Sequence, residues 1–316
     1  MNKKLLSIAI LASLPVCSTS YAASVWNIDL FTANTNGEIT DRLIGEGSWI
    51  SSLADPGISL GSYCNQTSAF DNSILGNYRN ILVDKISTTG GNANAFVSMS
   101  VTDGKLSFNN PSLNYGVGVV QWSGSSSIAG GTRANDYNVN YTGLSNFDLL
   151  GLGAVALEYT VFEADQGFPI TFEAYTDANN YTRVTIQTSA ASASSPVTEQ
   201  ISLAAMQNGN LCGYSYTDDA TAIGLGLDVR VRDIACGGVY TFGSVAGQTV
   251  DFSNLGALQA VFNYGLTNAP ATGAFDLTIT GITAVPEPSI IGLLGAGLLA
   301  FGGFKGSRRR TVSLDA

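Results

Sequence analysis

The chain has no histidine, and charged side chains make up only 12% of its 316 residues. Without histidine there is no Ser-His or Cys-His nucleophile pair, no His-ligated zinc site, and no imidazole general base. There is also no Gly-Lys-Ser/Thr phosphate loop and no complete Gly-x-Gly-x-x-Gly motif between a strand and a helix, so the sequence gives no support for nucleotide binding. The sequence therefore lacks the usual histidine-dependent catalytic motifs and the usual nucleotide-binding motifs.

Carboxylates are the groups left for catalysis, and a glycosidase needs only two of them. Four acidic residues lie in strand-like or turn-like sequence where they could meet: Glu158, Glu163, Asp165 and Glu173. Acidic side chains on the outward face of strands mostly interact with solvent, and we expect that role for these four. The sequence predicts a protein that is not an enzyme, and a secreted hydrolase is the least favoured alternative.

A long 3.6-residue periodicity is also missing from the middle of the chain, where short runs alternate between apolar and polar residues instead. The clearest runs lie at 155–161, 168–174, 183–187, 227–232, 258–264 and 275–279. Asp103-Gly104 separates two further runs and supplies the positive φ values of a tight hairpin turn. Residues 144–151 and 251–256 look alike, and each leads into an alternating run. These patterns predict an all-β, antiparallel two-sheet sandwich.

The N-terminus has the features of a signal peptide. Lys3 and Lys4 precede an apolar stretch from Leu5 to Val16, and Ser20-Tyr21-Ala22 places small residues where a signal peptidase cleaves. We expect residues 1–22 to be removed, so that the mature chain begins at Ala23. Lipoprotein processing at Cys17 is the alternative, disfavoured by the bulky Val16 before it.

The C-terminal tail combines an extended motif, an apolar run and a basic cluster. Pro286 and Pro288 fix their own φ and push the preceding residues out of the helical region, which predicts an extended, accessible segment. The uncharged run Ile290–Phe304 would span about 22 Å as a helix, against a hydrocarbon core of about 30 Å. The basic residues beyond it favour a short transmembrane helix with that end in the cytoplasm. They are Lys305, Arg308, Arg309 and Arg310.

Val285-Pro286-Glu287-Pro288, followed by this short run and the Arg cluster, resembles the PEP-CTERM sorting signal of bacteria that make exopolysaccharide. Thr311 to Ala316 extend further than such signals usually do. The resemblance implies recognition by an exosortase of a Gram-negative inner membrane and cleavage near Pro286-Glu287-Pro288. It also implies release or attachment of the body at the cell surface. The predicted turn and strand units are similar to the jelly-roll, galactose-binding-like modules that often precede this tail.

This arrangement predicts three segments: a signal peptide (1–22), an extracytoplasmic body (23–284) and a sorting signal (285–316). The body keeps 8 basic and 22 acidic residues, a net charge of −14, which argues against nucleic-acid or anionic-lipid partners. Three cysteines remain after signal removal, and the short loop between Cys212 and Cys236 favours their pairing over pairing with Cys64.

Two sets of residues are candidate ligand contacts. Asp177, Asn179, Asp218 and Asp219 offer oxygen ligands on turns that suit Ca²⁺, although their spacing matches no EF-hand and such clusters commonly just form turns. Trp26, Trp49 and Trp122 offer flat apolar faces for pyranose rings, but sandwich cores also use tryptophan.

Two functions follow from these features. The first is a non-enzymatic surface or matrix protein that is exported, sorted and left among exopolysaccharide, with signal peptidase and exosortase as partners during export. The alternative is a carbohydrate-binding module that recognises a polysaccharide.

Overall fold

The computed structural model describes residues 25–32, 39–41, 64–65, 74–88, 97–124, 137–238, 242, 247–263 and 274–286. The chain divides into one unit of residues 25–287 and a second unit of residues 1–24 and 288–316. The second unit lies outside the described residues, and with it the predicted signal peptide and C-terminal helix. No helix in the described part of the chain is long and apolar enough to span a membrane.

Among the described residues, the first sheet is antiparallel and has seven strands, with the long strand β15 (Phe275–Pro286) near its centre. Strand β1 (Trp26–Asp29) also pairs with β15, outside the main strand order. That order is β11 (Val197–Ser202), β8 (Ala154–Ala164), β15, β6 (Lys105–Asn110), β5 (Val97–Thr102) and β2 (Ile39–Asp41).

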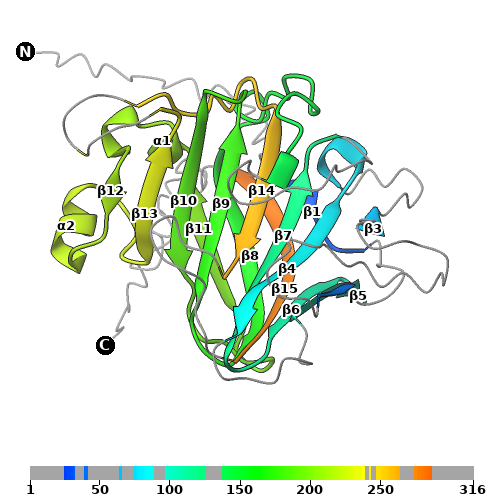
Figure 1. Cartoon of the computed structure of the whole chain (residues 1–316). Coiled ribbons are helices and arrows are strands. Elements are labelled where there is room, and N and C mark those ends of the chain that lie inside the picture. Colours follow the sequence, from blue (N-terminus) through cyan, green and yellow to red (C-terminus); the bar gives the residue numbers. More distant parts are fainter. Residues whose placement is uncertain are drawn as a thin grey trace, which may run out of the picture. The chain divides into compact units, whose positions relative to one another are not determined.

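The second sheet is antiparallel, has eight strands in the described part of the chain, and faces the viewer in Figure 1. Its order is β12 (Tyr214–Ser215), β13 (Val231–Cys236), β10 (Tyr181–Gln187), β9 (Pro169–Tyr175), β14 (Ala257–Phe262), β7 (Asn114–Trp122), β4 (Asn80–Thr88) and β3 (Cys64–Asn65). The described helices are all short, and the sequence patterns predicted none of them. They are α1 (Leu203–Met206), α2 (Asp219–Gly224) and the 3₁₀ turns η1 (Leu75–Asn77) and η3 (Gly209–Leu211).

The main core lies between the two sheets, where alternate residues of facing strands meet. Tyr159 of β8 packs on Phe172 of β9 with ring centroids 5.0 Å apart, and Phe108 of β6 stacks on Phe262 of β14 at 6.1 Å. All four side chains are buried. The prediction of an all-β protein with two antiparallel sheets is therefore confirmed.

A smaller core covers the outer face of the second sheet. Tyr137 packs on Leu82, Val119 and other buried side chains of β4, β7 and β14, and Val139 packs on Tyr175 of β9. Residues 137–141 therefore run across a sheet face that would otherwise meet solvent. Both faces of this sheet are buried over much of its area.

Local sequence signals placed several turns correctly. Asp103 and Gly104 have φ of 51° and 74° and join β5 to β6, whose Thr102 and Lys105 pair directly. The two similar segments 144–151 and 251–256 lie side by side, because Phe147 and Leu255 exchange backbone hydrogen bonds of 2.9 Å. Since β8 follows the first segment and β14 follows the second, this pairing joins the two sheets.

One predicted strand has different bounds. The run 227–232 was expected to be a strand throughout, but residues 227–230 form the turn before β13, and only Val231 and Arg232 belong to that strand. Asp228 and Arg230 pair within this turn, with Arg230 Nη2 2.7 Å from Asp228 Oδ2. The Asp228–Arg230 ion pair therefore stabilises a turn at residues 227–230, where the alternating pattern predicted an extended strand.

Candidate functional site

The predicted sorting motif begins inside the last strand of the body. Val285 and Pro286 are the final residues of β15, where they pair with Ala156 and Ala154 of β8 and are half-buried. The expectation of an accessible segment from Val285 is therefore wrong for these two residues, because pairing with β8 covers them. The folded body extends two residues past the predicted boundary at residue 284.

The rest of the tail lies outside the described residues. This holds for Glu287, Pro288 and the predicted basic cluster Lys305, Arg308, Arg309 and Arg310. Their predicted roles in processing and membrane retention stay predictions.

Trp122 is not a surface residue, and its prediction as a glycan contact is wrong. It lies on the inward face of β7, is fully buried, and its Nε1 donates a 2.9 Å hydrogen bond to Asp29 Oδ2. The indole therefore belongs to the core and satisfies a buried carboxylate.

Asp29 is the centre of a buried ion pair between the N-terminal strand and the second sheet. Arg79 Nη1 lies 2.8 and 3.0 Å from its two oxygens, and the Phe31 amide donates to Oδ1 at 2.7 Å. Both charged side chains are fully buried. Burial raises the pKa of the Asp29 carboxyl, while the charge of Arg79 and the hydrogen bonds from Trp122 and Phe31 oppose that rise. With these donors in place, the Asp29 cluster (Asp29, Arg79, Trp122) has a structural role, because it holds β1 against the second sheet.

Of the other two tryptophans, the structure describes one. Trp26 is 38% exposed at the start of β1, and its ring centroid lies 5.7 Å from that of Phe147. It keeps the exposure that a glycan contact requires. Trp49 lies outside the described residues.

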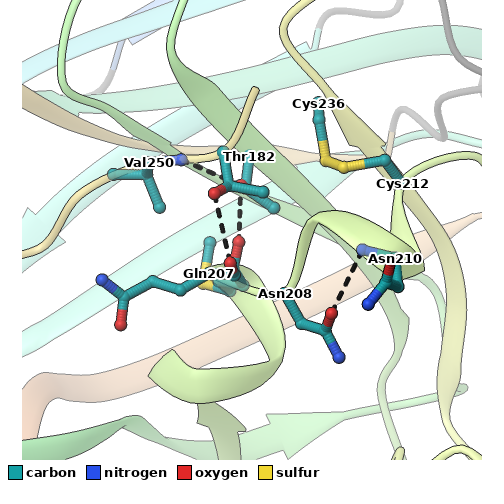
Figure 2. The surroundings of a disulfide bond; sticks show 9 residues. Thr182, Gln207, Asn208, Asn210, Cys212, Cys236 and Val250 are labelled. Carbon is teal, nitrogen blue, oxygen red and sulfur yellow. Dashed lines mark hydrogen bonds between the residues drawn. A yellow bond between two sulfur atoms is a disulfide. The ribbon is translucent and has the colours of Figure 1, made fainter. Parts of the chain in front are cut away.

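The structure contains the predicted Cys212–Cys236 disulfide, with a Cα–Cα distance of 5.5 Å. Figure 2 shows that it lies beside Thr182 of β10, whose hydroxyl donates to the Met206 carbonyl at 2.6 Å and accepts from the Val250 amide at 3.2 Å. A Cβ on Gly247 would lie 2.1 Å from Cys212 Sγ, so only glycine lets the neighbouring segment pass the disulfide. The bond ties the α1–η3 segment to β13, next to β10.

The carboxylates predicted to bind calcium have local structural roles. Asp177 accepts from the Asn179 and Asn180 amides at 2.7 and 2.9 Å, and its hydrogen bonds, with the Asn180 side chain first, lower the pKa of its carboxyl. Asp218 caps α2 by accepting from the Thr221 amide at 2.8 Å, and Asp219 accepts from the Tyr216 hydroxyl. Within the described ranges there is no group of three or more His, Cys, Asp or Glu residues arranged to hold a metal ion. The structure therefore gives no support to calcium binding at these turns.

A row of polar side chains crosses the outer face of the second sheet. Gln121 of β7, Gln259 of β14, Glu173 of β9 and Arg183 of β10 occupy successive paired positions. Gln121 Nε2 donates to Gln259 Oε1 at 2.5 Å, and Gln259 Nε2 donates to Glu173 Oε2 at 2.7 Å. Arg183 Nε lies 3.7 Å from the same Glu173 oxygen. Glu173 was expected to face solvent, but it is fully buried.

Three tyrosines lie beside the Arg183 end of this row. Tyr175 is fully buried, with its ring centroid 5.2 Å from that of Tyr141 and 5.5 Å from that of Tyr181. Its hydroxyl donates to Glu173 Oε2 at 2.5 Å. The Arg183 guanidinium lies 4.5 Å from the centroid of the Tyr181 ring. We call Tyr141, Tyr175, Tyr181, Arg183 and Glu173 the tyrosine cluster.

The cluster combines apolar and polar groups at the surface. Tyr141 and Tyr181 are partly exposed, and 15% of the Arg183 side chain is exposed. Aromatic rings beside fixed charged and amide groups are the usual lining of a sugar-binding surface. Sequence reasoning missed the cluster because alternation places Tyr175 and Tyr181 on one sheet face but does not bring Tyr141 to them.

A cavity of about 520 Å³ opens away from the tyrosine cluster, beside β11 and β13. Its walls come mainly from aliphatic side chains of β8, β11, α1, β13 and the turn before β13, including Leu203, Leu227 and Val231. Its polar members include Gln200, Ser202, Gln207 and Asp228. Among the described residues, no aromatic side chain lines it. Its volume suits a small molecule, but its lining lacks the rings that stack on sugars.

The described residues form two antiparallel sheets, and β15 is the last strand among them, ending at Pro286. The pattern of the PEP-CTERM protein-sorting motif matches residues 284–310, so this chain is a PEP-CTERM domain-containing protein. The motif marks an exported protein directed to the cell surface. No curated protein matches the sequence.

Some solved structures align with this chain at low similarity. A family 11 carbohydrate-binding module of the cellulosomal cellulase Lic26A-Cel5E of Clostridium thermocellum aligns with a TM-score of 0.34 and 10% identity, over 83% of this chain and 95% of that one. PfGH50B aligns with a TM-score of 0.34 and 8% identity over 66% of this chain, which spans only 22% of that protein. An exo-beta-agarase aligns with a TM-score of 0.31 and 11% identity, over 65% of this chain and 23% of the agarase chain. With TM-scores under 0.5, none of these alignments bears on the fold or the function of this chain.

Proposed function

We propose that this protein is a non-enzymatic component of the cell surface or extracellular matrix, delivered through its PEP-CTERM motif by an exosortase and retained among exopolysaccharide. The observation that carries the proposal is the motif at residues 284–310, which begins in the last residues of β15. A sorting signal continuous with the fold makes the β-sandwich body its cargo.

The environments of three buried carboxylates are consistent with the proposed non-enzymatic role. Asp29 is bound by Arg79 and Trp122, Glu173 lies in the tyrosine cluster, and Glu199 accepts from Arg230 Nη1 at 2.6 Å and from the Ser189 amide at 3.0 Å. Each carboxylate is held by donors from its own protein. A hydrolase with two carboxylates would need a pair facing a shared substrate site.

The test is a mass spectrum of the C-terminal peptide, taken from the envelope and medium of the native producer and of a strain lacking its exosortase. We expect the producer to yield a chain that ends near Pro286 or Pro288, and the deficient strain to retain Thr311–Ala316 in its membranes. A matched control is Ser313→Ala, which changes the tail outside residues 284–310 and should be processed normally.

The opposite result would be a full-length chain in both strains. The tail would then be a permanent anchor, and the proposal of sorting and release would fail. Screening the released protein against chromogenic glycosides and esters tests the non-enzymatic part separately, since turnover of any substrate would contradict it.

The second candidate function is polysaccharide binding, and the tyrosine cluster is the observation that favours it. Tyr141 and Tyr181 present partly exposed rings next to Arg183 on one sheet face. A glycan array probed with the mature protein from the producer separates the candidates. Binding to a polysaccharide would make the body a carbohydrate-binding module, whereas no binding would leave the first proposal alone.

A further inference from the structure

We propose that the partly exposed edge of the tyrosine cluster binds a neutral polysaccharide, with Tyr141 and Tyr181 contacting pyranose rings and Arg183 bonding their hydroxyls. This inference rests on the second candidate function and gives it a site and a class of ligand. The glycan contacts are then made by residues of β10 and of the segment 137–141 that crosses the sheet, and not by Trp122, which is buried.

The rings are held in place before any ligand arrives. Tyr175 lies between Tyr141 and Tyr181, with centroid distances of 5.2 and 5.5 Å, and is itself fully buried. It is a positioning residue, since it supports the two outer rings without reaching solvent. The backbone of Tyr141 also packs closely on Gly256, where an added Cβ would lie 1.9 Å from the Tyr141 carbonyl oxygen. Binding to rings that are already ordered costs little conformational entropy.

The polar groups of the site are also fixed by the sheet. Arg183 stacks over Tyr181 at 4.5 Å and lies 3.7 Å from Glu173, which in turn accepts from Gln259 and Tyr175. Glu173 is fully buried, so it orients Arg183 and does not compete for ligand at the surface. A guanidinium held in this way offers N–H donors to sugar hydroxyls next to an aromatic face.

Charge decides between neutral and acidic polymers. The body, residues 23–284, carries 8 basic and 22 acidic residues, a net charge of −14, and so repels polyanions. The cluster adds one arginine whose charge is balanced by Glu173. A neutral chain avoids this repulsion and can use the rings, which bind through apolar C–H faces.

The experiment measures binding of the mature protein, purified from the producer, to neutral glucans and galactans and to the acidic polymers alginate and polygalacturonate. Affinity electrophoresis at low and high salt gives the dissociation constants. We expect binding to a neutral polymer that does not change with salt, and a loss of about tenfold in Tyr141→Ala and in Tyr181→Ala, the effect of losing one aromatic contact.

Trp26→Ala tests the competing contact predicted from the sequence. Trp26 is an exposed aromatic residue of the other sheet, and we expect the affinity of this variant for the neutral polymer to equal that of wild type. Arg183→Leu should weaken binding while the Tyr181 ring remains. Tyr181→Phe keeps the ring and should bind nearly as well as wild type, which would assign the loss in Tyr181→Ala to the aromatic ring. Thermal unfolding midpoints of all variants check that they are folded.

Three results would overturn the proposal. They are binding to acidic polymers alone, binding that Trp26→Ala abolishes while Tyr141→Ala and Tyr181→Ala retain it, and no binding to any neutral polymer. The C-terminal mass spectrum reports on sorting independently, so failure of the glycan site and failure of the sorting proposal are distinguishable.

Discussion

Asp29 and Glu173 are both fully buried carboxylates that contact an arginine and an aromatic side chain, but their surroundings differ. Arg79 lies 2.8 Å from Asp29 and is itself fully buried, and the buried Trp122 donates a further hydrogen bond to Asp29. Arg183 stays 3.7 Å from Glu173, keeps part of its side chain in solvent, and stacks on a partly exposed ring.

The difference shows how the same residue types serve two purposes. At Asp29, the donors from Arg79 and Trp122 are buried, so the ion pair holds β1 against the second sheet. Neither charged side chain of this pair reaches the surface. At Glu173 the carboxylate is the buried base of a cluster whose outer members reach solvent. We therefore expect the first site to affect mainly stability and the second to affect mainly binding.

The largest effect is expected for Asp29→Ala. It leaves the Arg79 guanidinium buried without its carboxylate, which typically costs about 3–5 kcal/mol in the free energy of unfolding. Urea unfolding of the mature protein measures this loss. Affinity for the neutral polymer should not change while the variant is folded, and a loss below about 1 kcal/mol would contradict the structural role of the Asp29 cluster.

Removing the disulfide is expected to have the next largest effect. In Cys212→Ser combined with Cys236→Ser, loss of the cross-link between residues 24 apart should lower the free energy of unfolding by about 3 kcal/mol. Because Cys236 pairs with Thr182, between Tyr181 and Arg183 of β10, we also expect weaker polymer binding. Unfolding midpoints with and without reductant check this, since reductant should affect the wild type and leave the variant unchanged.

A smaller effect on stability is expected for Glu173→Gln. The amide keeps an oxygen for Gln259 and Tyr175 but loses the charge that orients Arg183, so the free energy of unfolding should fall by about 1 kcal/mol. Binding should weaken more than this stability change suggests. If Glu173→Gln destabilised the protein as much as Asp29→Ala while binding normally, the distinction between the two carboxylates would be wrong.

The smallest effect is expected at Asp228, whose pair with Arg230 is the solvent-exposed counterpart of the other two. Hydrogen bonds from Arg230 lower the pKa of the Asp228 carboxyl from its usual 3.8. Its contribution is therefore present above about pH 4 and is lost as the pH falls through the lowered pKa. At pH 6, Asp228→Asn should cost about 0.2–1 kcal/mol, and urea unfolding at decreasing pH should show the difference from wild type disappearing.

Several features followed from local sequence. Asp103-Gly104 specified its hairpin because both residues tolerate positive φ, and the alternation in β8, β9 and β14 specified strands because the side-chain period of a strand is two. The short loop between Cys212 and Cys236 indicated their pairing. The tail was recognisable because its order of motif, apolar run and basic cluster is linear.

The surroundings of Trp122, Glu173 and the tyrosines did not follow from local sequence. Alternation says which residues share a sheet face, but here residues 137–141 cover the outer face as well, so alternation does not separate buried from exposed positions. The same holds for β15, whose pairing with β8 extends into the sorting motif.

By itself, the sequence determined the strand-rich fold and the sorting tail and favoured the Cys212–Cys236 disulfide, because each depends on residues close together in the chain or on a fixed linear order. Only the tertiary structure decided which carboxylate is sealed in the core and which supports a surface cluster. Asp29 and Arg79 are 50 residues apart in sequence, and Gln259 and Glu173 are 86 apart. Contacts over such separations arise only when two sheets and a covering segment pack together.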